Sequence, residues 1–389
     1  MDGFINLLKP PGMTSSDAVV FVRKRLPRGT KVGHAGTLDP EAAGVLPVMV
    51  GRAARLSDHI MSGEKEYICE IALGAATDTQ DAQGALVGER HEPADADAVR
   101  AVLCQFTGDI MQRPSAYSAL KQGGKRLCDI ARAGGEVNVQ PRPVTIFELE
   151  YICQSAPDGH MLRVRCSKGT YIRALCDDIG RALGCGAHMR FLLRTLSAGF
   201  HLEDACTLED LDADIAAHIS PIDAPIMNMP MVLAGEELYA RVRCGNRLPV
   251  DELRGDVGND GVRRLYVRRP QGDARVGGDA NTAAEASCEC NANTSAEASC
   301  ECNANTSAEA SCECNANASA EAHIGCGANA EIAAHCAAEA AAQEAAMQPV
   351  STLGAPPIGY AFAGIVERDG DEMRFRAMLL DAEDGHAGI

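Results

Sequence analysis

Apolar and polar residues along the first two hundred positions follow two different periods. Short apolar runs predict strands at residues 4–8, 45–50 and 67–73. Amphipathic stretches predict a helix that is capped by Ser15, Ser16 or Asp17 and runs to Pro27, and further helices near residues 52–61, 94–107, 121–133 and 170–183. Because strands and helices alternate irregularly, the pattern predicts a mixed α/β or α+β architecture.

A boundary is predicted near residues 220–230, where the segment SPIDAPIMNMP is rich in proline and has no clear period. Beyond it, residues 238–267 and 360–380 contain short β-like segments. Between these segments lies an internal repeat: ASCECNANTSAE occurs twice in succession over 286–309, and ASCECNANASAE follows at 310–321. Its paired cysteines permit a soft-metal site. Its small polar composition cannot bury a core, which favours a disordered segment without a metal.

Charge is distributed unevenly along the 389 residues, whose net charge is −18. The first 200 residues hold 24 basic and 22 acidic side chains, whereas residues 271–350 hold one arginine and 12 acidic side chains. The N-terminal half can therefore carry local basic patches for nucleic acid, such as the basic run at 23–31, although a solvated helix end explains that run equally well. The sequence has neither a signal peptide nor a long apolar span, so we expect a cytoplasmic protein with no membrane contact.

One carboxylate stands among small and apolar residues in the segment GHAGTLDPEAAG, where Asp39 precedes Pro40. Asp before Pro is typical of a helix N-cap, and this local interpretation competes with a catalytic role. Tyr67 on a predicted strand and Arg173 at a predicted helix start could complete a site, because an arginine beside a buried carboxylate favours its ionised form. Each also has an ordinary explanation: a half-buried strand tyrosine, and a helical ion pair between Arg173 and Asp177.

Five ordered stretches decide between these alternatives: LLKPPGMTSSDAV, KVGHAGTLDPEAAGVLPVMVGRAARL, KEYICEIALGAATDTQDAQG, RPSAYSALKQGGKRLCDIARAG and VRCSKGTYIRALCDDIGRALGCGAHMRFLLRT. Together they cover most of residues 3–200, and in this order they resemble the bacterial TruB family of tRNA pseudouridine synthases. The resemblance implies a pseudouridine synthase fold with a central mixed, mainly antiparallel sheet over residues 1–225. It also implies, from a weaker match, a small β-rich PUA-like RNA-binding domain over 228–389, interrupted by an insertion at about 271–350.

The resemblance assigns roles to single residues. Asp39 matches the essential catalytic aspartate, Tyr67 the tyrosine that stacks on the target base and is implicated in proton removal from C5, and Arg173 the arginine that pairs with the aspartate. Four further residues match substrate or RNA positions: His34, which helps to hold the T-loop and the flipped nucleotide; Leu192, which lines the pocket; Lys9, a structural support; and Arg55, which would meet RNA phosphate.

The implied reaction isomerises the uridine at position 55 in the T-loop of tRNA. The N1–C1′ bond breaks, the base turns and C5 is joined to the sugar, after base flipping. Asp39 could attack the sugar or remove a proton from it, and the residues leave both mechanisms open. No cofactor or metal is required, the T-arm of tRNA is the expected partner, and a monomer without an obligate protein partner is expected. The alternatives are a tRNA-folding chaperone and a synthase acting on another RNA. The acidic 271–350 segment should point away from bound tRNA.

Overall fold

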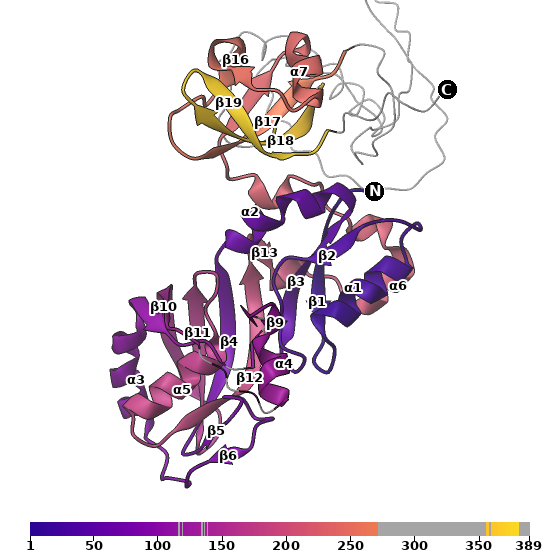
Figure 1. The fold of residues 1–389 in the computed structure, drawn as a ribbon. Coiled ribbons are helices and arrows are strands. Elements are labelled where there is room, and N and C mark those ends of the chain that lie inside the picture. The colour runs from indigo at the N-terminus through magenta and orange to yellow at the C-terminus, as the bar shows by residue number, and fades with distance from the viewer. Residues whose placement is uncertain are drawn as a thin grey trace, which may run out of the picture.

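The computed structural model describes residues 1–115, 117–118, 120–133, 135, 137, 139–270, 355–357 and 359–380. In these residues the chain forms two separate sheets, a large one below and a small one above in Figure 1. The mixed α/β architecture expected from the periodicity is confirmed. The internal repeat at 286–321 and the acidic segment around it lie outside the described residues.

The large sheet has nine strands in the order β1-β3-β12-β4-β11-β10-β7, with β2 on β3 and β13 on β12. The strands are β1 Gly3–Lys9, β2 Val32–His34, β3 Ala43–Val50, β4 Lys65–Leu73, β7 Gly108–Gln112, β10 Arg142–Gln154, β11 Gly159–Cys166, β12 Ala187–Ser197 and β13 Phe200–His201. All its neighbours are antiparallel except β3 and β12, which are parallel. The central sheet is therefore mixed and mainly antiparallel, as the family resemblance implied. Short two-residue strands form two hairpins beside it, β5 Ala76–Thr77 with β6 Leu86–Val87, and β8 Lys121–Gln122 with β9 Lys125–Arg126.

Helices flank the large sheet (Figure 1). They are α1 Ser15–Lys24, α2 Ser57–Ser62, α3 Ala96–Leu103, α4 Leu127–Arg132, α5 Ile172–Ala182 and α6 Leu208–Asp214, with 3-10 turns η1 Gly51–Leu56, η2 Cys104–Phe106, η3 Leu202–Asp204, η4 Ala216–His218 and η5 Ala224–Ile226. Helix α5 covers the centre of the sheet, where Ile172, Leu175 and Ile179 share one buried cluster with side chains of β4 and β11. Burial of this apolar face fixes the first turn of α5 against the sheet.

Two local predictions differ from the structure. The helix predicted over 121–133 begins only at Leu127, because the Gly123-Gly124 turn first closes the β8–β9 hairpin. The cap of α1 is Thr14, which accepts a hydrogen bond from the amide of Asp17, rather than Ser15, Ser16 or Asp17. Ser15 is buried instead, and its hydroxyl bonds the backbone of Leu38.

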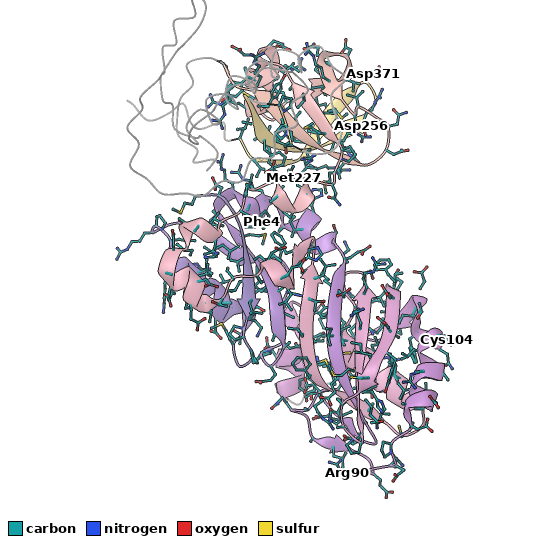
Figure 2. All side chains as sticks on the ribbon, turned by 180° about the vertical axis from the view of Figure 1, so that it is seen from behind. Phe4, Arg90, Cys104, Met227, Asp256 and Asp371 are labelled. Atoms are coloured by element: carbon teal, nitrogen blue, oxygen red, sulfur yellow. The ribbon has the colours of Figure 1, made fainter. Side chains whose placement is uncertain are left out.

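The small sheet is formed by the C-terminal part of the described chain, in the order β15-β19-β18-β17-β14-β16. Its strands are β14 Met231–Ala234, β15 Leu248–Pro249, β16 Leu253–Gly255, β17 Val262–Arg268, β18 Tyr360–Asp369 and β19 Glu372–Met378; helix α7 Tyr239–Arg243 and the turns η6 Glu236–Leu238 and η7 Val250–Glu252 lie between them. Ile365, Ala377 and Leu379 of this region pack in one cluster with Phe4 and Leu56 of the N-terminal part. The two sheets meet at the end of the large sheet that carries Phe4, where Figure 2 also shows Met227.

No helix among the described residues is long and apolar enough to cross a bilayer. The eight cysteines whose side chains are described carry free thiols, and five of them are buried. The five buried cysteines behave as small apolar residues of the core.

Candidate active site

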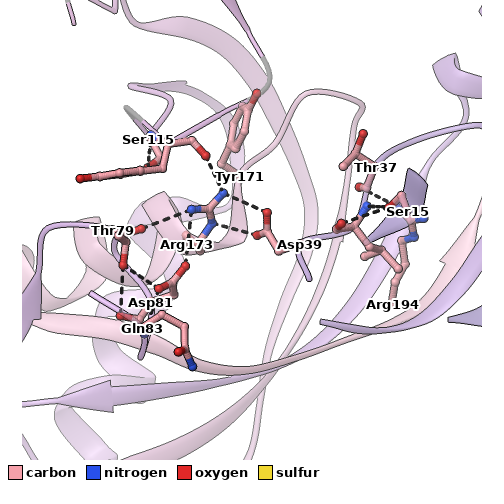
Figure 3. Close-up of polar contacts among 12 residues, drawn as sticks. Ser15, Thr37, Asp39, Thr79, Asp81, Gln83, Ser115, Tyr171, Arg173 and Arg194 are labelled. Atoms are coloured by element: carbon pink, nitrogen blue, oxygen red, sulfur yellow. Dashed lines mark hydrogen bonds and ion pairs between the residues drawn. The ribbon is translucent and has the colours of Figure 1, made fainter. Parts of the chain in front are cut away.

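Asp39 lies in the loop that joins β2 to β3. The loop turns with a hydrogen bond from the Ala42 amide to the Asp39 carbonyl, at 3.1 Å, and β3 begins directly at Ala43. No helix starts at Asp39, so its interpretation as a helix cap is wrong. Its side chain caps no helix and points toward Arg173 on α5 (Figure 3).

Arg173, in the first turn of α5, contacts both oxygens of this carboxylate, through an ion pair and a hydrogen bond. Its Nε lies 2.9 Å from Oδ2 of Asp39, and its Nη2 lies 3.1 Å from Oδ1. The alternative pair with Asp177 is wrong, because Asp177 accepts hydrogen bonds from Gln80 at 2.8 Å and from Arg181 at 2.5 Å. A bidentate guanidinium–carboxylate pair fixes both the position and the orientation of the carboxylate.

A second carboxylate shares Arg173. Oδ2 of Asp81 lies 3.5 Å from Nη1, and the same guanidinium donates to the carbonyls of Thr79 and Tyr117 at 3.4 and 3.3 Å. The Thr79 hydroxyl in turn donates to Oδ1 of Asp81 at 2.6 Å (Figure 3). Reasoning from the sequence missed Asp81 as a site residue, although the acidic turn TDTQD marked the segment.

Burial and charge oppose each other at Asp39. Loss of hydration on burial raises the pKa of Asp39 above its ordinary value, and the charge of Asp81 adds to the rise. The charge and hydrogen bond of Arg173 lower it. Arg173 therefore keeps the carboxylate available as an anion in a site that would otherwise favour its protonated form.

The carboxylate opens onto a cavity of about 270 Å³. Its walls come from five segments: the loop before β3, the turn after β5, the loop after β7, the first turn of α5 and the first half of β12. They include Asp39, Thr79, Asp81, Tyr117, Arg173, Phe191 and Leu192. A larger hollow of about 520 Å³ around Asn6, Cys206 and His218 contains neither Asp39 nor Arg173, so the chemistry and not the size identifies the site.

The structure brings some predicted residues to the cavity and places others around it. Leu192 is buried in the wall, as expected. Tyr67 on β4 is 8 % exposed and lies outside the cavity lining; burial raises the pKa of its hydroxyl. His34 ends β2, and its buried Nδ1 has no hydrogen-bond partner among the described residues. Burial lowers the pKa of His34, so the neutral ring is favoured.

Lys9 and Arg55 do not reach the cavity. The buried ammonium of Lys9 donates to the carbonyls of Pro10, Met13 and Pro40 at 2.8, 2.7 and 3.0 Å, which ties the loop after β1 to the loop that carries Asp39. Burial lowers the pKa of Lys9 to about 8. Arg55 lies exposed on η1 and donates to the carbonyl of Met378 in the small sheet.

Two residues that support the site were not predicted. The Ser15 hydroxyl donates to the Leu38 carbonyl at 3.1 Å and accepts from its amide at 2.9 Å. Arg194 on β12 donates to carbonyls of the same loop. Both contacts join segments far apart in the sequence, so no local pattern pointed to them. In the described part of the chain, no cluster of His, Cys, Asp or Glu side chains is arranged to hold a metal ion.

Comparison with known proteins identifies the family of this chain. The N-terminal domain model of TruB family pseudouridylate synthases matches residues 23–172, and the C-terminal domain model of tRNA pseudouridylate synthase B matches residues 173–229. The tRNA pseudouridine synthase B of Alkaliphilus oremlandii is 44% identical over 64% of this chain and 83% of its own length, and that of Burkholderia mallei is 43% identical over 68% and 89%.

Solved structures show a similar backbone. The chain matched in the structure of an H/ACA RNP bound to a substrate RNA containing 2′-deoxyuridine is 28% identical, with a TM-score of 0.52 over 69% of this chain and 74% of that one. The chain matched in a Cbf5-Nop10-Gar1 complex is 29% identical at the same TM-score and coverage. With these identities and coverages, the chain belongs to the TruB family of tRNA pseudouridine synthases, enzymes that isomerise uridine to pseudouridine.

Proposed function

We propose that this enzyme converts the uridine at position 55 in the T-loop of tRNA, and that Asp39 is the residue on which the chemistry depends. The observation that carries the proposal is the bidentate pair between Asp39 and Arg173 at the wall of the 270 Å³ cavity. The target base must leave its stack to reach a carboxylate in such a recess, so the reaction begins with base flipping.

Within the cavity, Asp39 acts on the sugar of the flipped nucleotide, either as a nucleophile at C1′ or as a base toward a sugar proton. Arg173 holds the carboxylate ionised and oriented for both mechanisms. Leu192 supplies an apolar wall for the base. Tyr67, on the neighbouring strand β4, stacks on the base and assists proton removal from C5. The chain's own groups suffice for this isomerisation, so the proposal includes no cofactor or metal.

Residues around the cavity bind the RNA or support the loop. His34, half-buried and favoured as the neutral ring, faces the flipped nucleotide and the T-loop. Lys9 acts through the backbone of the Asp39 loop and not through the substrate. Arg55 lies on the surface beside the small sheet and meets RNA phosphate there. We also propose that the small sheet is a PUA-like RNA-binding domain within 228–389, and that the enzyme is a cytoplasmic monomer.

Tritium release tests the proposal directly. A tRNA transcript made with [5-³H]uridine is incubated with the wild-type enzyme and with Asp39→Asn, and a transcript with cytidine at position 55 serves as the RNA control. We expect release by the wild type alone, and none from the control transcript. Equal release by Asp39→Asn would remove Asp39 from the chemistry. Undiminished release from the cytidine transcript would assign another target, and tRNA refolding without any release would leave the chaperone role.

A further inference from the structure

Arg194 carries a charge in the interior that no carboxylate neutralises. It lies on β12 with 1 % of its surface exposed, and it forms no ion pair with any residue that the structure describes. A buried charge is expensive unless hydrogen bonds replace its lost hydration, and a core position of this size could be filled by an apolar side chain at less cost. Its contacts therefore have to explain its presence.

The guanidinium of Arg194 spans the loop that carries Asp39. Nη2 donates to the carbonyl of Gly36 at 3.1 Å and Nη1 to that of Thr37 at 3.4 Å, both before Asp39. Nε donates to the carbonyl of Val45 at 2.7 Å, after Asp39 on β3. One rigid group thus ties the entry and the exit of the loop to β12, the strand that also places Leu192 in the cavity wall. Figure 3 shows Arg194 beside Thr37 of this loop.

The same side chain reaches Tyr67. Arg194 and Tyr67 are direct partners across the antiparallel strands β12 and β4, so their side chains lie on one face of the sheet. The charge of Arg194 partly opposes the rise that burial causes in the pKa of Tyr67.

We propose that Arg194 is a positioning residue that holds the Asp39 loop in a fixed relation to the Tyr67 side chain on the neighbouring strand for the isomerisation. The inference rests on the proposed function, because it concerns the two groups assigned to the sugar and to the base. Its basis is geometric: the three carbonyl contacts need the planar fork of arginine, which the single ammonium of lysine cannot reproduce, and Tyr67 lies directly opposite Arg194 on β4.

Measurements of kcat and KM distinguish a positioning role of Arg194 from a role in the stability of the fold alone. Arg194→Lys keeps the charge and loses the fork, and Arg194→Met loses both. Arg264→Lys is the matched control, since Arg264 is also fully buried, contacts a tyrosine hydroxyl and donates to a backbone carbonyl, but lies in the small sheet. We expect kcat for tritium release to fall by at least tenfold in Arg194→Lys and further in Arg194→Met, with KM for tRNA changed less than threefold and Arg264→Lys close to wild type.

Hydrogen exchange provides a readout that does not require activity. The amides of Ala35 and Leu38 bond Pro47 and Ser15, so loosening of the loop is measurable there by mass spectrometry of the peptide around residues 35–42. Faster exchange in Arg194→Lys, and not in Arg264→Lys, is expected. Unchanged exchange overturns the proposal whatever the rates are, and so does a kcat of Arg194→Lys equal to that of the control. If the wild type releases no tritium, the proposed function fails, while the exchange result still tests whether Arg194 holds the loop.

Discussion

The Arg173 guanidinium contacts both oxygens of the Asp39 carboxylate. Arg173 lies in the first turn of α5, 134 residues after Asp39 in the sequence. Arg173 is almost fully buried, whereas the Asp39 side chain remains 36% exposed toward the cavity. Arg173 is thus held in place by the surrounding protein, whereas the Asp39 carboxylate is accessible to a substrate in the cavity.

Replacing Arg173 by lysine should lower kcat/KM roughly 10²-fold, the scale of losing one oriented donor in an active site. The single ammonium cannot hold both oxygens, so the pKa of Asp39 rises further from its already raised value. Since the carboxylate is the active form, activity is lost as pH falls through this pKa. The acid limb of the pH–rate profile should therefore move to higher pH, and a limb that stays in place would contradict the assigned role.

Asp81→Asn should move the same limb in the opposite direction. The charge of Asp81 raises the pKa of Asp39, so its removal lets Asp39 ionise at lower pH. Arg173 also loses an anionic partner at 3.5 Å, and kcat is expected to fall about tenfold from poorer positioning of the pair. Profiles of Arg173→Lys and Asp81→Asn measured together distinguish this coupling from a general loss of folding, which would shift neither limb.

Apolar periodicity predicted the strands at 4–8, 45–50 and 67–73 and a helix where α5 lies, and five ordered motifs pointed to Asp39, Tyr67 and Arg173, because both kinds of pattern are local. The structure pairs Asp39 with Arg173, whereas Tyr67 lies outside the cavity lining. The sequence did not allow the contacts of Asp81, Ser15 and Arg194 to be predicted. Ser15 looked like a helix cap, and only the approach of the loop to α1 makes its hydroxyl a partner of Leu38. The parallel pairing of β3 with β12, at Ala43–Leu193 and Gly44–Arg194, is a long-range contact that no local pattern encodes.

Lys9→Met should change how stability depends on pH. The pKa of Lys9 is about 8 in the folded protein, below its ordinary value of 10.5, so between these values the unfolded chain binds more protons. The contribution of Lys9 to the free energy of unfolding therefore rises with pH between these two values. Lys9→Met lacks this rise. Urea unfolding at pH 7, 8, 9 and 10 should show wild type improving relative to Lys9→Met. Exposed Lys31→Met is the control and should follow the wild type.

Tyr266→Phe should weaken the protein without affecting catalysis. The Tyr266 hydroxyl donates to Asp223, in the segment between the two sheets, and accepts from Arg264 at 3.0 Å. Loss of this buried hydroxyl removes two hydrogen bonds to charged groups, which costs about 1–3 kcal/mol of unfolding free energy. Denaturant midpoints measure the loss, and Tyr360→Phe is the comparison from the same sheet. A reduced kcat in Tyr266→Phe would show that the small sheet contributes to the chemistry.

Deletion of residues 286–321 should leave kcat and the denaturant midpoint within error of wild type. The residues that flank this stretch of sequence are secured independently of it, because Arg268 on β17 pairs directly with Tyr360 on β18. The entropy of closing a connection grows slowly with its length, by about 0.6 kcal/mol for each doubling. Loss of activity on deletion would assign a function to the repeat, and a drop in bound metal would identify that function as chelation.

The pairing of Arg268 with Tyr360 also has a genetic consequence. Each copy of the repeat is 12 residues long, so a copy gained or lost during DNA replication keeps the reading frame. Because this pairing does not involve the repeat, we expect both flanking strands to keep their hydrogen-bonded neighbours when the number of copies changes. We therefore expect a change in repeat number to leave the folded domains unaltered. The gene can then vary in length at this point while the catalytic domain stays the same.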